Sequence, residues 1–323
     1  MTTLENRLPT GRHTYRNPVH EGYFADPFVL RDGDRYVAYG TGAAPGGLQF
    51  EVLGSTDLVS WTSLGGALRP VTAELGGDYW APEVAHADGR WWMYYSVGHG
   101  DVGHHLRVAV ADRPEGPFTD LGVNLTPHER FAIDPHPFRD ADGTWYLYFA
   151  RDVLDAERVG TQLAVAVLTA MDELADEVAT VLAPSADWQL YERDRAIYGG
   201  RHDWHTLEGP TVREHDGTYY CFYSGGSWQG AGYAVAWASA PGPLGPWTEP
   251  ADGSGRLLAS VPDHVRGPGH NSVVTTVGGT DMIVYHAWDE HLTARQLCID
   301  PLRWTAAGPV TPGPTWDDQP LPG

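Results

Sequence analysis

The sequence predicts an all-β protein, a five-bladed β-propeller whose four-stranded antiparallel blades surround a central channel. Three observations predict this class. Five segments share one strand–turn–strand pattern, glycine occupies each turn, and helical periodicity is nearly absent. Only residues 171–182 (MDELADEVATVL) read as a helical turn. Repeated units of a few dozen residues indicate a repeat architecture such as a propeller.

Each repeat reads as a short apolar strand, a glycine turn and a strand of alternating aromatic residues. The five repeats start at Asp26, Ala81, Asp134, Glu208 and Gly269. Their turns carry Gly33, Gly89, Gly143, Gly217 and Gly279, at intervals of 56, 54, 74 and 62 residues. Glycine turns between such strands predict β-hairpins. A further strand and a tail that is usually rich in Trp or Pro follow each pair, which completes a blade.

The longest interval holds an insert over about residues 186–206, rich in Trp, His and Arg. Because it directly precedes the fourth repeat, we expect it to shape a site there. The repeats cover the chain, so we expect one domain over residues 1–323. A β-sandwich is the alternative, since its strands are also evenly spaced.

The charge balance favours a neutral substrate. The chain has 42 Asp and Glu against 21 basic residues, all of them Arg, and a net charge of -21. The absence of Lys excludes a Walker-type phosphate loop and a Schiff-base lysine. Such an acidic protein should be repelled by nucleic acids and anionic membranes. Its 13 Trp and 16 Tyr suit both β-sheets and sugar-binding clefts.

The remaining global features indicate a cytoplasmic protein with buried thiols. Cys221 and Cys298 lie in apolar, strand-like runs, and two cysteines do not make a disulfide framework. The first 20 residues contain no apolar signal segment, and no stretch is long enough to span a membrane. A secreted protein stripped of its signal would look the same. The sequence does not indicate an oligomeric state.

Three carboxylates, Asp26, Asp134 and Glu208, lie at matching places at the start of the first strand of their repeats. In a propeller this strand is nearest the axis, so the three should converge on one axial pocket. Like charges in a partly dry pocket separate their pKa values, as acid–base chemistry requires. Glycoside hydrolysis is the reaction class that most often uses paired carboxylates. The alternatives are a turn-capping Asp-Pro and a calcium site, although the dense spacing of a calcium loop is missing.

A set of short motifs, in this order along the chain, carries a family resemblance. They are ADPF (25–28), DYWAPE (78–83), IDPHPF (133–138), LEGP (207–210), GPGHNSV (267–273), YHAW (285–288) and RQLCIDPLRW (295–304). With them the sequence resembles glycoside hydrolase family 43, and the wider clan of five-bladed propeller glycosidases, over nearly its whole length.

The resemblance implies unequal roles for the carboxylates. Asp26 matches the general base that activates water, and Glu208 matches the general acid that protonates the leaving oxygen. Asp134 matches a third carboxylate that orients the acid and raises its pKa, in a reaction that inverts the anomeric centre. Arg295 matches an arginine that reaches the pocket from the last blade, where we expect it to keep Asp134 ionised and bind sugar hydroxyls. A surface salt bridge is the alternative for Arg295.

Further site residues follow from the same resemblance or from position. Trp80 matches an aromatic residue that stacks on the sugar, with blade packing as the alternative. His270 matches a histidine that helps to hold a hydrated Ca²⁺ or Na⁺ ion in the channel, with a buried core histidine as the alternative; no cofactor is required for the chemistry. His286 is expected to line the same channel. Trp204, His205 and His202 lie beside Glu208 in the sequence and are expected to line the leaving-group side.

The predicted function is exo-acting removal of α-L-arabinofuranosyl residues from arabinan or arabino-oligosaccharides, with a neutral pentose glycoside as substrate. Many β-xylosidases of the family carry a β-sandwich domain after the propeller, for which this sequence has no room, and the insert before Glu208 favours exo action. A β-D-xylosidase or an endo-arabinanase is the alternative within the family. A non-catalytic carbohydrate-binding propeller and a phosphorylase or transglycosylase are alternatives from other classes.

Overall fold

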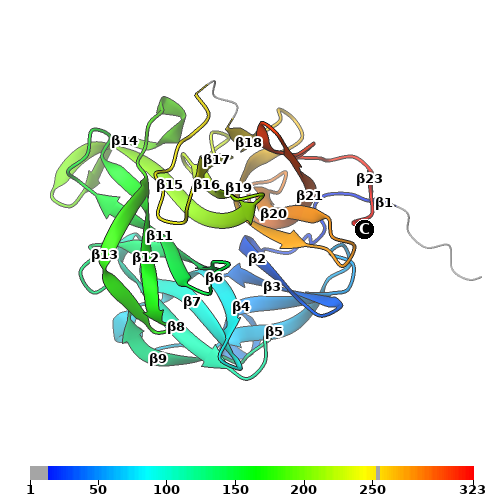
Figure 1. Cartoon of the computed structure of the whole chain (residues 1–323), viewed down its shortest axis with the longest axis horizontal. Helices are drawn as coiled ribbons and strands as arrows, with labels where there is room; N and C mark the ends of the chain where they lie inside the picture. The colour runs from blue at the N-terminus through cyan, green and yellow to red at the C-terminus, as the bar shows by residue number, and fades with distance from the viewer. Residues whose placement is uncertain (1–13, 252–254) are drawn as a thin grey trace, which may run out of the picture.

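The computed structural model describes residues 14–251 and 255–323 and is built almost entirely of β-strands (Figure 1). The predicted all-β class is confirmed. The only helical segments in these ranges are three short 3₁₀ turns: η1 (Pro45–Gly47), η2 (Ala73–Leu75) and η3 (Asp187–Gln189). No helix in the described ranges is long and apolar enough to span a membrane.

Three four-stranded antiparallel sheets and one nine-stranded sheet hold most of the described strands. Apart from one added strand, the nine-stranded sheet consists of two four-stranded antiparallel units joined by a short parallel bridge, so the chain forms five such units in order. The first two units are β2 (Ala25–Asp32), β3 (Arg35–Thr41), β4 (Gln49–Ser55) and β5 (Thr62–Leu68), then β6 (Asp78–Ala87), β7 (Arg90–His99), β8 (Val102–Ala111) and β9 (Thr119–Asn124). The third is β10 (Ala132–Arg139), β11 (Trp145–Val153), β12 (Gly160–Ala170) and β13 (Glu173–Leu182). The last two are β15 (Gly200–His215), β16 (Thr218–Gly225), β17 (Ala234–Ala240) and β18 (Arg256–Leu258), then β19 (Arg266–Thr275), β20 (Asp281–Trp288), β21 (Arg295–Thr305) and β22 (Gly308–Val310).

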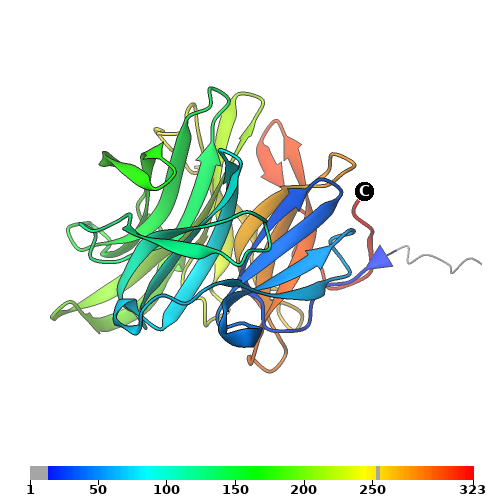
Figure 2. The same ribbon diagram turned by 90° about the horizontal axis from the view of Figure 1, so that it is seen from below.

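The first strands of the five units form a closed inner ring. Strands β2, β6, β10, β15 and β19 contact one another in this order, and β19 contacts β2 again. Figure 1 shows the units following the colour order around a common centre, and Figure 2 shows their strands side by side at a right angle to that view. Residues at equal positions of these five strands therefore face one another across the centre.

Neighbouring units are held together by five hydrophobic clusters, one at each junction. Tyr39 and Phe50 of the first unit pack with Tyr95 of the second, for example, and the last cluster joins Val284 of the fifth unit to Val29 of the first. Alternation of side chains along each strand sends apolar residues to both faces, because both faces of a unit are covered by neighbours. The aromatic content noted in the sequence fills these junctions.

The two cysteines lie within these clusters. Cys221 and Cys298 are both buried and both free, as the sequence predicts. Burial raises the pKa of each thiol above its usual value, which makes them inert packing groups.

The two ends of the described chain meet. Strand β1 (Thr14–Tyr15) pairs with β23 (Gln319–Pro320), and the C-terminus lies beside β1 in Figure 1. The Tyr15 hydroxyl donates to the carbonyl of Ile299 in the fifth unit. Most of the N-terminal segment inspected for a signal sequence, residues 1–13, lies outside the described residues.

Two expectations change with the structure. The helical turn expected over residues 171–182 is wrong, since residues 173–182 form β13, which pairs with β12 and buries Val181 and Leu182. The insert before the fourth repeat is a β-hairpin, in which β14 (Leu190–Ile197) pairs with the first half of β15. A short parallel bridge between Gly160 and His205 ties this hairpin to the third unit.

The bridge supplies a stability prediction. A Cβ atom at Gly160 would lie 1.8 Å from the His205 carbonyl oxygen, at a φ of +152°. Gly160→Ala should therefore lower the free energy of unfolding by about 2–3 kcal/mol, measured by thermal or urea unfolding. Gly77→Ala is the matched control, because nothing lies within 4 Å of a Cβ there. Equal stability of the two variants would contradict the close approach of β12 and β15.

Candidate active site

Every inner strand is interrupted by a β-bulge at the same place, and the residue at the bulge has a left-handed backbone. The five residues and their φ angles are Asp26 (52°), Ala81 (48°), Asp134 (58°), Gly209 (58°) and His270 (47°). For a non-glycine residue this conformation costs about 1 kcal/mol or more of free energy. A bulge re-aims side chains and interrupts pairing. The repeated bulge thus turns one ring of residues towards the centre.

Glu208 does not occupy the same position as the two aspartates, which corrects the expected match. It pairs with Ser224, just as Trp80 pairs with Ser96 and Ile133 with Ala150, so it lies one residue before the bulge. The bulge position in the fourth unit is Gly209. The sequence Glu-Gly-Pro against Asp-Pro already contains this offset of one residue.

Two adjacent rings of residues consequently line one cavity of about 350 Å³. Asp26, Asp134 and His270 come from the bulge ring, and Trp80, Ile133 and Glu208 come from the ring before it. The structure thus brings together all three predicted carboxylates. The remaining lining residues are Tyr23, Thr41, Asp101, Phe131, Asp152, Thr161, Tyr191, Arg195, Ile197, Thr206, Trp228 and Arg295.

Asp26 is the anionic centre of the cavity. Its Oδ1 lies 3.0 Å from Arg295 Nη1 and 3.4 Å from the Nδ1 atoms of both His270 and His286. Burial alone would raise the pKa of Asp26, but the charge of the adjacent Arg295 guanidinium outweighs it and holds the pKa well below its usual value. Asp26 is therefore ionised at neutral pH.

Arg295 pairs with Asp26 and not with Asp134, in contrast to the sequence expectation. Its Nη2 also donates to the Tyr23 hydroxyl at 3.0 Å, and its guanidinium lies 4.6 Å from the Trp228 ring centre. The pairing follows from the fold, because β21 belongs to the unit next to β2 and β10 lies farther round the ring. The two aromatic rings fix the planar guanidinium against the cavity wall.

His286 forms a hydrogen bond with the backbone of Asp26 and does not line the cavity. The sequence predicts that it lines the channel, so this expectation is corrected. It has no solvent-exposed surface. Its Nδ1 accepts the backbone N–H of Asp26 at 3.1 Å, and burial lowers the pKa of His286 well below its usual value. The ring is therefore neutral, and it stacks on Tyr233 with 5.9 Å between ring centres.

Glu208 has the opposite electrostatic character. Burial raises the pKa of Glu208 to about 7; the Tyr233 hydrogen bond lowers it, and the charge of Asp26 raises it. The Tyr233 hydroxyl donates to Glu208 Oε1 at 2.6 Å. Tyr233 can reach this place only because residue 269 is glycine, since a Cβ there would lie 1.9 Å from the Tyr233 ring.

Asp134 is influenced by the charges of the other two carboxylates. Burial, and after it the charges of Glu208 and Asp26, raise the pKa of Asp134 well above its usual value, while the N–H of Gly209 lowers it. That N–H donates to Asp134 Oδ2 at 2.9 Å. Like charges this close cannot all ionise. With Asp26 ionised, Asp134 and Glu208 hold a proton between them near neutral pH.

Trp80 presents a fixed aromatic face at the cavity. Its ring stacks on His104 with 3.7 Å between ring centres and an angle of 19°. Burial lowers the pKa of His104 to about 4, so this supporting ring is neutral. A flat, rigid indole at a half-polar cavity suits stacking on a sugar ring.

The β14–β15 hairpin forms one wall of the cavity, but through residues other than those expected. Tyr191, Arg195 and Ile197 of β14 line the cavity. Arg195 Nη2 lies 2.6 Å from Asp101 Oδ2, in the turn between β7 and β8, so an ion pair bridges the second unit and the hairpin. Its guanidinium also lies 5.4 Å from the Trp204 ring centre.

Trp204 and His205 lie behind this wall and do not line the cavity, which corrects their expected role. Trp204 is 1% exposed because Arg195 covers its ring. His205 points to the other face of β15 by strand alternation, and its Nε2 lies 3.0 Å from Arg158 Nη1. His202 packs against Trp204 farther along the hairpin.

Sequence reasoning missed several lining residues that lie outside the repeat motifs. Tyr23 precedes the first repeat, Asp101 lies in a turn, and Trp228 lies in the loop after β16. Asp152 lines the cavity at the end of β11 and accepts hydrogen bonds from Thr161 and Tyr198. Spacing alone gave no signal for these four lining residues, because they lie in loops or at the end of a strand.

A metal centre is not evident around His270. Its Nδ1 faces Asp26 and Asp134 at 3.4 and 4.0 Å, and burial lowers its pKa. Within residues 14–251 and 255–323, no group of three or more His, Cys, Asp or Glu side chains has the arrangement of a metal site. A cation there would depend on one ring nitrogen and water.

Comparison with known proteins gives a consistent picture. The sequence profile of glycosyl hydrolases family 43 matches residues 15–310. A β-D-galactofuranosidase of Aspergillus niger is 29% identical over 316 residues, covering 92% of this chain and 84% of that protein. An extracellular exo-α-(1→5)-L-arabinofuranosidase of Streptomyces avermitilis is 25% identical over 84% of this chain and 56% of its own length. The crystal structure of a thermostable family-43 glycoside hydrolase superposes with a TM-score of 0.82 at 32% identity, covering 96% of this chain and 99% of that one.

The two neighbours of Glu208 predict opposite shifts of its pKa. Tyr233→Phe removes a hydrogen bond that stabilises the carboxylate, so the pKa of Glu208 should rise above about 7. Asp101→Asn removes a negative charge, so the pKa should fall below that value. A ¹³C NMR titration of the Glu208 carboxyl carbon measures both. Shifts in the same direction would contradict the electrostatic arrangement described for the cavity.

Proposed function

The chain belongs to glycosyl hydrolase family 43, and on that premise we propose that it is an inverting, exo-acting α-L-arabinofuranosidase. The observation that carries the proposal is the contrast within one cavity between Asp26, held ionised by Arg295, and Glu208, whose pKa burial raises to about 7. Such a pair matches the base and acid of glycoside hydrolysis. We also propose that the five four-stranded units are the blades of one five-bladed propeller domain, as the closed ring of inner strands supports.

We propose the following division of labour. Asp26 accepts a proton from a water molecule as that water attacks the anomeric carbon, and Glu208 donates its proton to the departing glycosidic oxygen. Asp134 and Glu208 share one proton near neutral pH; in the reactive state that proton lies on Glu208, and the N–H of Gly209 favours the negative charge on Asp134. Protein-bound protons thus balance, because Asp26 gains one as Glu208 loses one.

Substrate binding is proposed for the rigid groups around these carboxylates. Trp80 offers a stacking face for the sugar ring, and Arg295, with its N–H groups beside Tyr23, suits sugar hydroxyls. The hairpin wall, joined to the second unit by the Asp101–Arg195 ion pair, closes one side of the cavity. A cavity closed on one side favours cleavage at a chain end.

A second candidate, β-D-galactofuranosidase activity, is favoured by the Aspergillus niger relative, which matches a larger share of its own length. L-Arabinofuranose is D-galactofuranose without its terminal carbinol group, so the two ring configurations agree. A site that binds D-galactofuranose therefore differs from a site that binds L-arabinofuranose only in the extra space it needs beyond C5.

The substrate and the acid are tested together with aryl glycosides. We expect release of L-arabinose from an aryl α-L-arabinofuranoside, and from linear arabino-oligosaccharides one unit at a time. Glu208→Gln should lower kcat by roughly 10²–10⁴-fold on a substrate with a poor leaving group, and less with a good one. Faster turnover of the galactofuranoside would select the second candidate. Tight oligosaccharide binding without any release would indicate a binding protein instead.

Controls keep this test interpretable. Glu177→Gln, an exposed residue on β13, should leave activity unchanged. The folded state retains a proton on Glu208 that the unfolded chain, with a pKa of 4.5, releases, so wild-type stability falls as pH rises from about 4.5 to about 7. Glu208→Gln should therefore be at least as stable as wild type at pH 8. Wild-type turnover by this variant on the poor leaving group would disprove the acid assignment.

We propose that a Ca²⁺ or Na⁺ ion binds near His270 in a structural role and that the carboxylates alone carry out the reaction. Treatment with a chelator should then lower the melting temperature and leave kcat within about twofold at a temperature where the protein stays folded. A large loss of kcat without unfolding, restored by added Ca²⁺, would contradict this proposal.

A further inference from the structure

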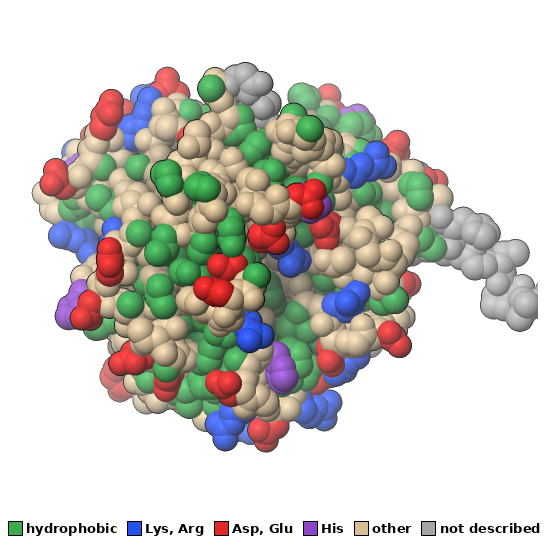
Figure 3. Space-filling model, in the orientation of Figure 1, with side chains coloured by type: hydrophobic (Ala, Val, Ile, Leu, Met, Phe, Trp, Pro, Cys, Tyr) green, Lys and Arg blue, Asp and Glu red, His purple; other side chains and the backbone are tan. Residues whose placement is uncertain are grey.

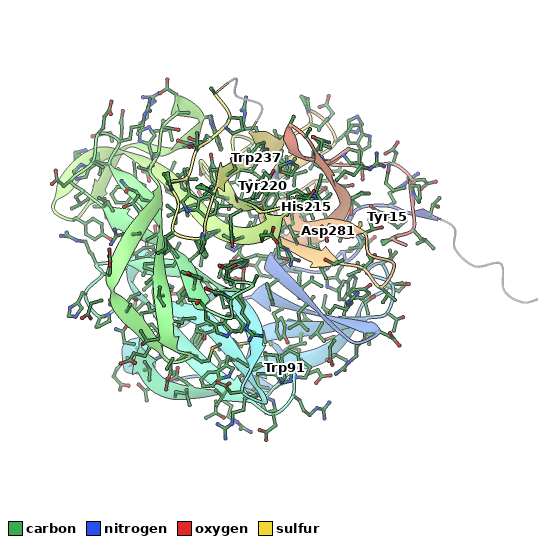
Figure 4. The ribbon with its side chains drawn as sticks, viewed as in Figure 1. Tyr15, Trp91, His215, Tyr220, Trp237 and Asp281 are labelled. Atoms are coloured by element: carbon green, nitrogen blue, oxygen red, sulfur yellow. The ribbon has the colours of Figure 1, made fainter. Side chains whose placement is uncertain are left out.

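A second cavity of about 440 Å³ lies at the opposite end of the five inner strands. The first cavity is lined by the beginnings of these strands, whereas the second is lined by their later residues. These are residues 28–31, 84–85, 136–139, 211–213 and 272–275, together with Trp145. Figure 4 labels His215, Asp281 and Trp91 at the hairpin ends on this side, and Figure 3 shows a hollow at the centre of the same face.

The charge of this cavity is opposite to that of the first. Arg31, Arg139 and Arg213, from β2, β10 and β15, line it, and no Asp or Glu is among its described lining residues. Figure 3 shows both basic and acidic side chains around the central hollow, although the acidic ones are not among the residues that line the cavity. Five carboxylates line the first cavity, and the whole chain has a net charge of -21. The three arginines make this cavity basic, although the protein as a whole is acidic.

The three guanidinium groups keep unused donors. Arg31 Nη1 donates to the Thr276 carbonyl at 2.7 Å, and Arg213 Nη2 donates to the Val273 carbonyl. Arg139 lies 5.9 Å from the Trp145 ring centre and has no hydrogen bond or ion pair with any described residue. Each guanidinium has five N–H donors. Within the described residues, none of the three guanidinium groups forms an ion pair with a carboxylate.

The acidic groups nearest to Arg213 are already engaged. Glu83 and Asp281 raise its pKa, although burial lowers it overall. Glu83 Oε2 lies 2.6 Å from His136 Nδ1, on the channel side of the cavity. Asp281 accepts hydrogen bonds from Thr275 and from Trp304. Neither carboxylate forms an ion pair with Arg213 within the described residues.

We propose that this cavity binds a phosphate group, either as inorganic phosphate or as a phosphate monoester. Planar guanidinium groups match phosphate oxygens two at a time. Three positive charges suit the dianion better than a carboxylate with one charge. The side chains of Phe28, Phe138 and Trp145 supply apolar walls against which the organic part of an ester packs.

The test is binding at constant ionic strength, independent of catalysis. Inorganic phosphate and glucose 6-phosphate should each raise the melting temperature along a saturable curve and give a Kd by calorimetry, whereas acetate and glucose should not. A tighter Kd for glucose 6-phosphate identifies the ester as ligand, and equal constants identify free phosphate. A melting temperature that responds no more to phosphate than to chloride would overturn the proposal.

Variants locate the site. The double variant Arg31→Gln/Arg139→Gln changes two exposed rim residues and should weaken phosphate binding roughly tenfold or more. Arg303→Gln, an exposed arginine on β21, is the control and should bind as wild type does. The double variant should keep wild-type turnover on an aryl furanoside, which shows that it folds. Undiminished phosphate binding by this folded variant would place the anion elsewhere and refute the assignment.

Discussion

The site depends on one backbone constraint, a left-handed bulge at the same point of five neighbouring inner strands. Four of the five bulge residues carry a side chain and adopt a conformation that costs free energy locally. The hydrophobic clusters between all five pairs of units compensate for that cost. As a result, one layer of side chains inside the ring points towards its centre. The small residues Ala81 and Gly209 in that layer leave room for their neighbours.

A second layer of side chains, one residue before the bulge in each strand, gives the cavity carboxyl groups of opposite protonation state. Asp26 comes from the bulge layer and meets Arg295 and two histidines, whereas Glu208 comes from the earlier layer and meets a tyrosine hydroxyl. A cation holds one carboxyl ionised, and burial with nearby negative charge keeps a proton on the other. Gly269 contributes to this arrangement, because the absence of a side chain there leaves space for the Tyr233 ring beside Glu208. The geometry of the backbone therefore determines the protonation states.

The repeated features of the fold could be predicted from the sequence, whereas the contacts between side chains of different units could not. The glycine turns, the strand pattern and the convergence of Asp26 and Asp134 follow from spacing, and the structure agrees with them. Contacts between side chains of different units have no such signature. The sequence predicts that Arg295 pairs with Asp134, but Arg295 pairs with Asp26, because the fifth unit lies next to the first in the circular order of the units. The sequence places Trp204 in the cavity, yet Arg195 from the paired strand covers the Trp204 ring.

The central claim is that Asp26 and Glu208 act as separate base and acid on opposite sides of one anomeric carbon. The stereochemistry of the first product tests it most directly. ¹H NMR recorded within the first minutes of hydrolysis, before mutarotation, should show the β-anomer of L-arabinofuranose from an α-L-arabinofuranoside, or the α-anomer of D-galactofuranose from a β-D-galactofuranoside. Initial release of the anomer with retained configuration would contradict the account, because it would require a carboxylate to attack the sugar in place of water.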